Sequence, residues 1–272
     1  MLAWSARDGA LAADAYRPAT VAGRYVPTLT PVACTWPARR PWALAHADQF
    51  RPGPPPALAS DTWARDYREI HDVGARTNSR RTPEQTRIAR FWETTGAAIY
   101  MELVRGAAAA PGRDELRNAR LLAVVAQAMD DAAIAVFDAK YAYTFWRPVT
   151  AIRNGDLDGN PATERDSAWT PLIETPMHPE YPCAHCIISG AVGAVLAAEF
   201  AGAPPALATT SPTLPGERRS WATLEEFENE VANARVWDGV HFRHSTEIGT
   251  DMGHRVGAWS VAHFAANLAR TD

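Results

Sequence analysis

The stretch from about Asp114 to Tyr143 is the feature that most limits how this chain can fold. It contains the run LRNARLLAVVAQAMDDAAIAVFDAKYAY, which reads as one long helix. The middle of this run is apolar nearly all the way round. A helix of that kind has no broad face suited to water and is normally buried. We therefore expect it at the centre of a helical bundle.

Further helices are expected on both sides of this central one. Ser60 is a good N-cap for an amphipathic helix that continues to about Ala75. Thr82 and Pro83 read as a cap followed by a proline at the first helical position, and they open a helix to about Val104. The remaining helices are expected over about 184–200, 223–235 and 244–270. No strand pattern competes, so the predicted fold class is all-α.

The last predicted helix carries glycines four residues apart on one face, at Gly249, Gly253 and Gly257. Each glycine costs a helix roughly 1 kcal/mol relative to alanine. Three such losses on one stripe indicate close approach to another helix. The expected partner is the small-residue face of the 184–200 helix, formed by Gly190, Ala194 and Ala197.

The N-terminal residues differ in composition from the rest of the chain. Residues 1–59 carry many prolines, including the run Pro54-Pro55-Pro56, with aromatic residues between them. Proline removes a backbone donor and clashes with the preceding turn, so this segment cannot be a long helix. We expect an extended arm over 1–59 that packs through its aromatics on a single helical-bundle catalytic domain over 60–272.

The overall composition limits the possible binding partners and the cellular localisation. The chain has 272 residues, 47% of them hydrophobic and 21% charged, and a formal net charge of −4. Nothing global steers it toward nucleic acid or membranes, so any anion must be bound by locally clustered cations. No apolar run reaches 18 residues, and the N-terminus is charged where a signal peptide has its apolar core. No export signal is expected, and localisation stays unknown. A homo-oligomer is compatible with this sequence.

Three polar clusters interrupt the apolar second half. In KYAYTFWRP, Lys140 and Arg147 lie seven residues apart, about two helical turns, and both project from one side if the helix persists to Trp146. In ARVWDGVHFRH, Arg235 and His241 repeat the pairing of a cation with an imidazole. His185 lies at the start of a helix, where backbone N–H groups lack intrahelical partners. We predict that the three clusters converge on an oxyanion site.

These residues also allow other interpretations. One alternative is that Lys140 and Arg147 are solvated charges at a helix end, and a lone histidine is more often structural than catalytic. Histidine changes protonation near neutral pH, so His241 fits a nucleophile or a metal ligand and His185 an acid/base. Cys183 and Cys186 in CAHC, with a histidine, offer a zinc knuckle, but a second ligand pair at knuckle spacing is missing. The three cysteines do not make a disulfide framework.

The order of the three clusters resembles a known signature. KYAYTFWRP, YPCAH and ARVWDGVH are similar to the three-part motif of the vanadium-dependent haloperoxidase and phosphatidic-acid phosphatase (type two) superfamily, with its spacings kept in all three parts. The resemblance runs from about Tyr25, through RRTPEQTRIARFW, to the last helix and is strongest with the bacterial chloroperoxidase-like branch. It implies a helical-bundle fold that holds vanadate, a phosphate analogue.

The resemblance also implies roles for single residues. Lys140, Arg147 and Arg235 would neutralise the oxyanion, together with the Cys183-Ala184 segment that precedes the histidine. His241 would bond the vanadium atom and His185 would act as acid/base. Hydrogen peroxide, a halide and a small organic substrate would be the partners. The same pocket filled by phosphate would run a phosphatase in which His241 attacks phosphorus.

This chain departs from the family pattern in three places. Cys183 and Ala184 stand where the family has Ser-Gly, which replaces a good hydroxyl donor by a weak thiol and a permissive backbone position by one with a Cβ. Ser245 stands four residues after the final histidine, where the family commonly has Asp. A carboxylate there would orient the imidazole and raise its basicity. We expect the additional N-terminal helices of larger relatives to be absent or lost from the gene model.

Three functions therefore remain open from the sequence. The first is a vanadium-dependent haloperoxidase-like oxidoreductase. The second is an acid-phosphatase-like phosphoric ester hydrolase on the same scaffold. The third is a pseudo-enzyme that keeps the fold and an anion site for binding or assembly.

Overall fold

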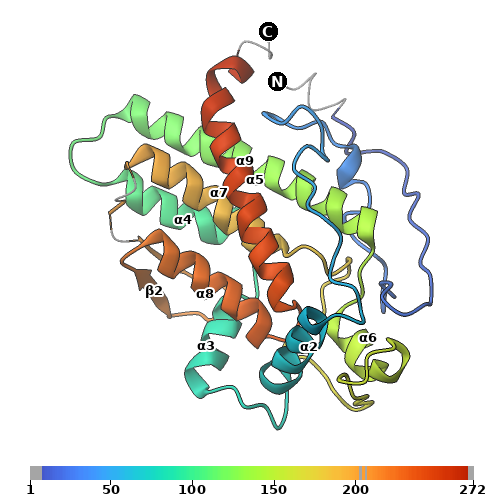
Figure 1. Ribbon diagram of the computed structural model, residues 1–272. Helices are drawn as coiled ribbons and strands as arrows, with labels where there is room; N and C mark the ends of the chain where they lie inside the picture. Colours follow the sequence, from blue (N-terminus) through green and yellow to red (C-terminus); the bar gives the residue numbers. More distant parts are fainter. Residues whose placement is uncertain (1–7, 202–203, 206, 269–272) are drawn as a thin grey trace.

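The computed structural model describes residues 8–201, 204–205 and 207–268 of the chain, and its elements are almost all helical (Figure 1). This confirms the all-α fold class. The α-helices are α2 (Asp61–Gly74), α3 (Pro83–Phe91), α4 (Ala97–Ala108), α5 (Glu115–Tyr143), α6 (Pro148–Arg153), α7 (Ala184–Glu199), α8 (Leu224–Trp237) and α9 (Arg243–Leu268). Two 3-10 turns, η1 (Trp36–Ala38) and η2 (Gly155–Leu157), lie in the connections. The predicted end of the last helix at Arg270 lies outside the described residues.

Helices α5, α7 and α9 form the centre of the molecule, with α9 crossing both of the others in Figure 1. The middle of α5 is buried on nearly every side, as its apolar sequence predicts. The glycine stripe of α9 faces α7, which confirms the predicted close packing. A Cβ added to Gly253 would lie 2.3 Å from the Ile187 carbonyl oxygen, and one added to Gly257 would lie 2.5 Å from that of Ala191. Only glycine allows the two backbones to come this close.

One predicted helix is wrong, and the central helix lacks the extension to Trp146 that would place Arg147 on it; both differences bear on the site. The helix expected from Thr82 to Val104 is interrupted between Phe91 and Ala97, where Gly96 has a φ of 106° that breaks the helical path. Helix α5 ends at Tyr143 and not at Trp146, because Thr144 closes it in the left-handed region with a φ of 50°. Arg147 is therefore the N-cap of α6, with Pro148 at the first helical position.

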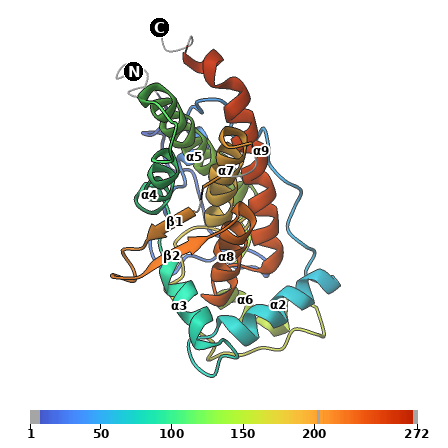
Figure 2. The ribbon, with the colours of Figure 1, turned by 90° about the vertical axis from the view of Figure 1, so that its left-hand side faces the viewer.

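One short hairpin lies between α7 and α8, where no strand was expected. Strands β1 (Leu207–Thr210) and β2 (Arg218–Trp221) pair antiparallel, with Leu207 opposite Trp221. Figure 2 shows the hairpin at the side of the bundle, next to α4 and α8. Buried Trp221 and Leu207 join the main hydrophobic core there.

The N-terminal segment makes specific contacts with α5. The backbone amides of Trp42, Ala43 and Leu44 all donate to the carboxylate of Asp131, which is fully buried on α5. Further toward the N-terminus, the amide of Tyr25 donates to the Thr144 carbonyl at 2.7 Å. The division into an arm over 1–59 and a catalytic domain over 60–272 stays a prediction. None of the described helices is both long enough and apolar enough to cross a lipid bilayer.

Candidate functional site

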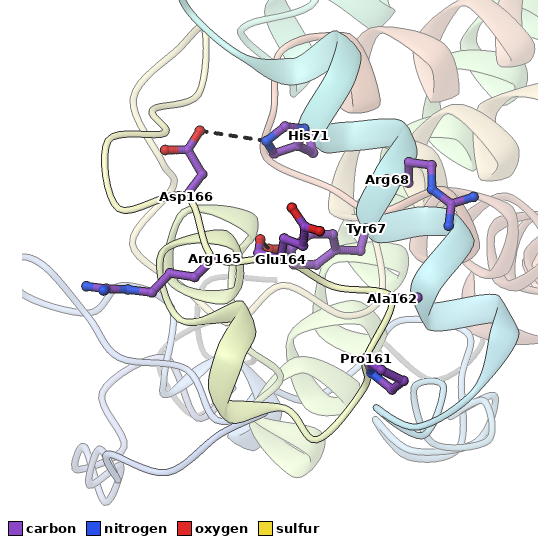
Figure 3. Close-up of a pocket in the computed structure, with 8 residues that line it drawn as sticks. All are labelled: Tyr67, Arg68, His71, Pro161, Ala162, Glu164, Arg165 and Asp166. Carbon is purple, nitrogen blue, oxygen red and sulfur yellow. Dashed lines mark hydrogen bonds and ion pairs between the residues drawn. The ribbon is translucent and has the colours of Figure 1, made fainter.

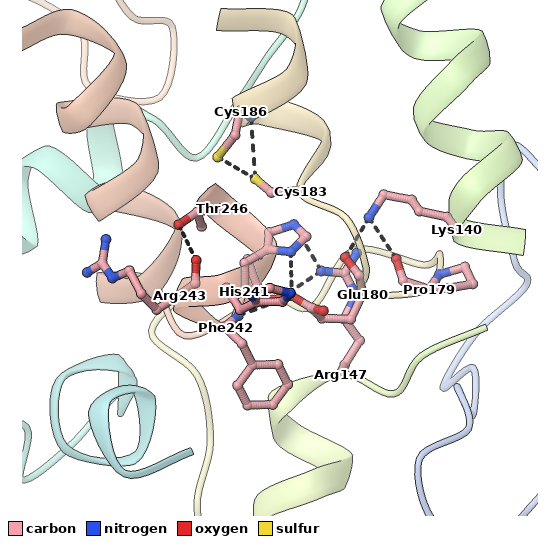
Figure 4. A network of polar contacts seen from close by, with 12 residues as sticks. Lys140, Arg147, Pro179, Glu180, Cys183, Cys186, His241, Phe242, Arg243 and Thr246 are labelled. Carbon is pink, nitrogen blue, oxygen red and sulfur yellow. Dashed lines mark hydrogen bonds and ion pairs between the residues drawn. The ribbon is translucent and has the colours of Figure 1, made fainter. Parts of the chain in front are cut away.

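A buried polar site lies where the end of α5, the loop before α7 and the turn between α8 and α9 meet (Figure 4). Lys140, in the last turn of α5, is fully buried, and its ammonium group donates to the carbonyls of Pro179 at 2.9 Å and Glu180 at 2.7 Å. Both acceptors belong to the loop that leads into α7. Lys140 of the KYAYTFWRP cluster thus binds the loop that precedes the YPCAH motif.

Arg147 reaches the same loop from the other side of the α5–α6 junction. Its Nε atom donates to the His178 carbonyl at 2.8 Å, and Nη1 donates to the Val240 carbonyl at 2.8 Å. Nη1 also lies 3.3 Å from Nε2 of His241. The two cations converge as predicted, although they do not share a helix. Their convergence comes from loop 178–180, which both side chains bind.

Arg235 is fully buried at the end of α8. Its Nη1 atom donates to the Trp92 carbonyl at 2.6 Å and forms an ion pair with Asp238 at 2.7 Å. The break between α3 and α4 leaves this carbonyl available, because the helix ends there. The Nε and Nη2 atoms of Arg235 are buried and have no hydrogen-bond partner within the described part of the chain. Buried N–H groups normally have a hydrogen-bond acceptor, so these two donors of Arg235 could both bind an acceptor that is not part of the described chain.

His241 is held by a carboxylate that the sequence interpretation missed. Its Nδ1 atom lies 2.9 Å from Oε1 of Glu180, and the Phe242 amide donates to the same oxygen at 3.1 Å (Figure 4). Glu180 stands three residues before Cys183 in the second cluster, and it is completely buried. An acidic residue directly before the YPCAH motif was a usable signal, because a buried carboxylate needs a cation or several donors.

His185 and its neighbours occupy the first turn of α7. Cys183 is the N-cap and Ala184 the first helical residue. The Cys183 sulfur accepts from the Cys186 amide at 3.4 Å and from the Cys186 thiol at 2.8 Å. The Nε2 atom of His185 is buried and has no partner among the described residues.

Burial and nearby positive charges lower the pKa values of several basic groups at the site. Burial lowers the pKa of Lys140 well below its usual value, and the charge of Arg147 lowers it further. Burial also lowers the pKa of Arg147 to about 10. The pKa of His241 falls well below its usual value, first through burial and then through Arg147 and Lys140. Burial also lowers the pKa of His185 well below its usual value, and the charge of Arg235 has the next largest effect. Both imidazoles are therefore neutral at pH 7.

Three buried cations, two neutral imidazoles and several unused donors are what a tetrahedral oxyanion needs. Arginine supplies forked donors and lysine a point charge to such an anion. Vanadate or phosphate would accept from the free N–H groups of Arg235, and its negative charge would oppose the lowering of the Lys140 pKa that burial, and then Arg147, cause. The charges and donors of these residues are therefore suited to a tetrahedral oxyanion such as vanadate. The orphaned donors of Arg235 are the observation on which this fit rests.

The structure gives the zinc interpretation no ligand set. Within the described residues, no group of three or more His, Cys, Asp or Glu side chains is placed to hold a metal ion. The two thiols of CAHC bind each other, as described above. A surface pocket of about 470 Å³ lies elsewhere, between α2 and residues 161–166, and the His71 and Asp166 side chains face each other across it (Figure 3). None of the predicted site residues lines this pocket.

The relatives of this chain carry related names. The protein is 31% identical to vanadium chloroperoxidase from Curvularia inaequalis over 144 residues, which cover 43% of this chain and 23% of that protein. Its fold is similar to that of a bacterial vanadium-dependent iodoperoxidase, with a TM-score of 0.76 at 28% identity over 88% of this chain and 60% of the other. The fold is also similar to that of an apo-type bacterial vanadium-dependent chloroperoxidase, with a TM-score of 0.73 at 19% identity. That match covers 93% of this chain and 65% of the other.

This chain spans less than two thirds of the length of each of these relatives. The match to a family is nevertheless extensive, because residues 120–270 match the family of the VCPO second helical-bundle domain. That range includes all three polar clusters, and it covers more than half of the chain. The protein belongs to the vanadium haloperoxidase family.

Proposed function

We propose that this protein is a vanadium-dependent haloperoxidase-type oxidoreductase that uses vanadate held in the buried cation site. The observation that carries the proposal is the set of unsatisfied donors at this site. Nε and Nη2 of Arg235 are buried without an acceptor among the described residues, beside two further buried cations. A resident oxyanion supplies the missing acceptors. The names of the relatives favour vanadate as that oxyanion.

Each site residue has a distinct part in this proposal. Lys140, Arg147 and Arg235 neutralise the oxygens of the anion. His241 offers the lone pair of Nε2 as the single direct ligand to vanadium. The Ala184 amide in the first turn of α7 is a candidate donor to the anion, whereas the Cys183 amide already donates to the Ser245 carbonyl at 3.1 Å. Cys183 itself would contribute only its thiol.

When bound, vanadate supplies a Lewis-acidic centre that makes hydrogen peroxide a stronger oxidant without changing the oxidation state of the metal. In the overall reaction the peroxide takes two electrons from a halide, consumes one proton, and leaves as hypohalous acid and water. His185 is neutral and its Nε2 atom is unpaired within the described chain, so it can take a proton from peroxide and return it later. An organic substrate would then be halogenated by the hypohalous acid.

A phosphoric ester hydrolase is the second candidate for the same site. Phosphate has the tetrahedral geometry of vanadate, and His241 has the features of a nucleophile. Its Nε2 atom is unprotonated, and a carboxylate supports the ring from the opposite side. In this reaction His241 attacks phosphorus and His185 protonates the leaving alcohol. The third candidate, a pseudo-enzyme, corresponds to an anion site with neither activity.

One experiment separates the three candidates. The purified protein is dialysed free of phosphate, loaded with orthovanadate, and assayed for peroxide-dependent halogenation with iodide, bromide and chloride. Hydrolysis of an aryl phosphate is measured on the vanadate-free protein. We expect halide oxidation that depends on vanadate and falls at least about 100-fold in His241→Ala. The exposed His46 serves as the control position, and His46→Ala should keep full activity. Hydrolysis without halide oxidation would favour the phosphatase, and anion binding alone would favour the pseudo-enzyme.

A further inference from the structure

We infer that Glu180, in the loop before α7, is the positioning residue of His241. The position four residues after His241 is Ser245, which is buried on α9. Its hydroxyl makes no aligned hydrogen bond within the described chain. The carboxylate that contacts Nδ1 of His241 comes instead from Glu180. The inference rests on the proposed role of His241 as vanadium ligand.

Glu180 is fixed at both ends of the residue. Its backbone amide donates to the Phe145 carbonyl at 2.9 Å, and its own carbonyl accepts from Lys140 at 2.7 Å. Its carboxylate oxygen Oε1 accepts from the Phe242 amide and meets the imidazole. These three contacts other than the one to the imidazole hold Glu180 in place if the ring turns. The carboxylate therefore sets the orientation of His241 and does not adapt to it.

The hydrogen bond also decides which imidazole nitrogen carries the proton. An ionised carboxylate is only an acceptor, so beside ionised Glu180 the Nδ1 atom carries the proton and Nε2 keeps its lone pair. Nε2 faces Nη1 of Arg147 at 3.3 Å, a donor, which requires the same tautomer. Two independent contacts thus select the form of His241 that can bind a metal. Partners of this kind typically change metal affinity 10–100-fold when they are removed.

Ser245 and Glu180 occupy neighbouring positions beside the imidazole. The Ser245 hydroxyl is close enough to the Glu180 carboxylate to lower the pKa of that group, against the larger effect of burial, which raises it. The Ser245 carbonyl accepts from the Cys183 amide, which joins α9 to the start of α7. Since α9 and the loop lie this close, one carboxylate can reach the ring from either side.

A carboxylate swap tests the inference. Glu180→Gln introduces an amide that can donate to Nδ1 and so permits the Nε2-protonated tautomer. The double variant Glu180→Gln with Ser245→Asp returns a carboxylate from the α9 side. Two quantities are measured in wild type and both variants. The first is the tautomer of His241 in the ligand-free protein, by ¹⁵N–¹H correlation NMR of the imidazole. The second is orthovanadate affinity, by equilibrium dialysis, with inorganic phosphate as the comparison ligand.

We expect Glu180→Gln to populate the Nε2-protonated tautomer and to weaken vanadate binding about 10–100-fold. Phosphate binding, which needs no bond to His241, should change less than vanadate binding. The double variant should restore both the tautomer and the vanadate affinity to within about threefold of wild type. A single variant with an unchanged tautomer and unchanged vanadate affinity would overturn the inference, and so would a double variant without rescue. If Glu180→Gln does not fold, Glu180→Asp keeps the carboxylate but shortens it, and should give an intermediate loss.

The NMR readout separates this inference from the proposed function. It concerns the ligand-free protein, so it does not depend on vanadate chemistry. If wild type binds no vanadate but the tautomer responds to Glu180→Gln, the proposed function is wrong and the positioning role stands. If wild type binds vanadate and the tautomer does not respond, the positioning role is wrong and the function stands.

A different pair of residues carries a second inference: the structure assigns Cys183 and Cys186 as a redox-active dithiol. Both thiols are fully buried at the start of α7, and their sulfur atoms lie 2.8 Å apart. Burial by itself raises the pKa of Cys183, but the hydrogen bond from the Cys186 thiol and the charge of Arg235 outweigh it and lower that pKa. Burial raises the pKa of Cys186. The pair thus has one nucleophilic and one protonated thiol.

The reaction needs only the peroxide that the proposed function consumes. The Cys183 thiolate attacks one peroxide oxygen, the O–O bond breaks, and hydroxide leaves, so that sulfur loses two electrons and becomes a sulfenic acid. The Cys186 sulfur then attacks Cys183, a disulfide forms, and water leaves. A neighbouring thiol in this way protects Cys183 from irreversible oxidation to sulfinic acid.

Peptide mass mapping after treatment with hydrogen peroxide tests this assignment, with Cys34 as an internal control. Burial raises the pKa of Cys34, and it has no thiol partner among the described residues. We expect a Cys183–Cys186 disulfide that dithiothreitol reverses, while Cys34 stays reduced for longer. In Cys186→Ser, Cys183 should advance to sulfinic acid. Sulfinic acid at Cys183 in wild type without a disulfide, or two thiols that resist peroxide, would overturn the assignment.

Discussion

The Nη1 atom of Arg147 lies 3.3 Å from the Nε2 atom of His241. The same guanidinium nitrogen donates to the Val240 carbonyl, one residue before the histidine, so its position is fixed relative to the ring. A permanent cation at this distance opposes protonation of the imidazole, in addition to burial. The lone pair of His241 is therefore kept available at pH values where an exposed histidine would be charged.

The two histidines should fail in different ways when they are replaced. His241→Ala removes the only proposed direct ligand and should abolish retention of vanadate on a desalting column. His185→Ala should still retain vanadate but lose turnover by about 100-fold or more, because an acid/base acts mainly in the transition state. Vanadium content by elemental analysis, measured beside the halogenation rate, checks both. Equal vanadium retention in the two variants would contradict the ligand role of His241.

Anion binding should depend on Arg235. A ligand that binds only the folded protein raises its stability by RT ln(1 + [L]/Kd), so phosphate and vanadate should raise the Tm of wild type. Arg235→Ala removes two unsatisfied donors and should reduce this shift strongly. Each shift is measured against the ligand-free Tm of the same variant, because Asp238 loses its ion-pair partner as well.

The exposed Arg80, which pairs with Asp72 on the surface, provides the matched control for Arg235. Arg80→Ala should keep the full anion-dependent shift. If Arg235→Ala shows the same shift as wild type and Arg80→Ala, the oxyanion is not bound at Arg235.

Much of the site was predictable because spacing along the chain is a local property. The distances between Lys140 and Arg147, and between Arg235 and His241, identify the two cation clusters, and the α7 start places His185. The central position of α5 follows from its apolar surface. The glycine stripe predicted the contact of α9 with α7, because only close helix packing offsets three glycines.

What the sequence did not reveal depends on contacts between distant segments. Glu180 is one acidic residue in a polar loop until the fold brings it to His241, 61 positions away. The helix break after Phe91 has a local signal in Thr94-Thr95-Gly96, residues of low helix propensity, but the helix-favouring residues on both sides led to the prediction of one continuous helix. The role of this break is visible only in the folded structure, where the Trp92 carbonyl accepts a hydrogen bond from Arg235. A positive φ at Gly96 is likewise a property of the folded backbone.

The glycine stripe makes a stability prediction. In Gly253→Ala the new methyl group would meet the Ile187 carbonyl oxygen at 2.3 Å, and this backbone atom cannot move without shifting α7. We expect a loss of about 1–3 kcal/mol in the free energy of unfolding. Gly106→Ala in α4 is the matched control, because nothing lies within 4 Å of its added Cβ. That variant should gain up to about 1 kcal/mol. Urea denaturation compares them, and equal effects would contradict close packing at Gly253.

The pair formed by His254 and Glu228 should make stability depend on pH. Nε2 of His254 on α9 lies 2.8 Å from Oε2 of Glu228 on α8, and this hydrogen bond raises the pKa of the histidine. Because the folded pKa exceeds the unfolded value, the stabilisation is fully present below the unfolded pKa and is lost as pH rises through the folded pKa. His254 is about half exposed, so solvent screening limits the effect to about 0.5 kcal/mol.

Urea unfolding at pH 5.5 and pH 9 checks this dependence. His254→Gln should be less stable than wild type at pH 5.5 and nearly equal to it at pH 9. Glu228→Gln should lose the same pH-dependent part, since it removes the other partner. A His254→Gln variant whose deficit is larger at pH 9 would reverse the expected sign and reject the ion pair.

The hydrogen bond from Arg235 to the Trp92 carbonyl affects the order in which the site forms during synthesis and folding. The bond from Arg235 to Trp92 spans 143 positions, and those from Arg147 to Val240 and from Lys140 to Glu180 span 93 and 40. Contacts between residues so far apart in the chain form slowly, because the entropy of closing a long loop is lost before the contact stabilises the fold. No nascent fragment that stops before α8 can collect the three cations around one anion. Under the proposed function, oxyanion affinity would be acquired only after α8 has been synthesised and packed, and it would report the completion of folding.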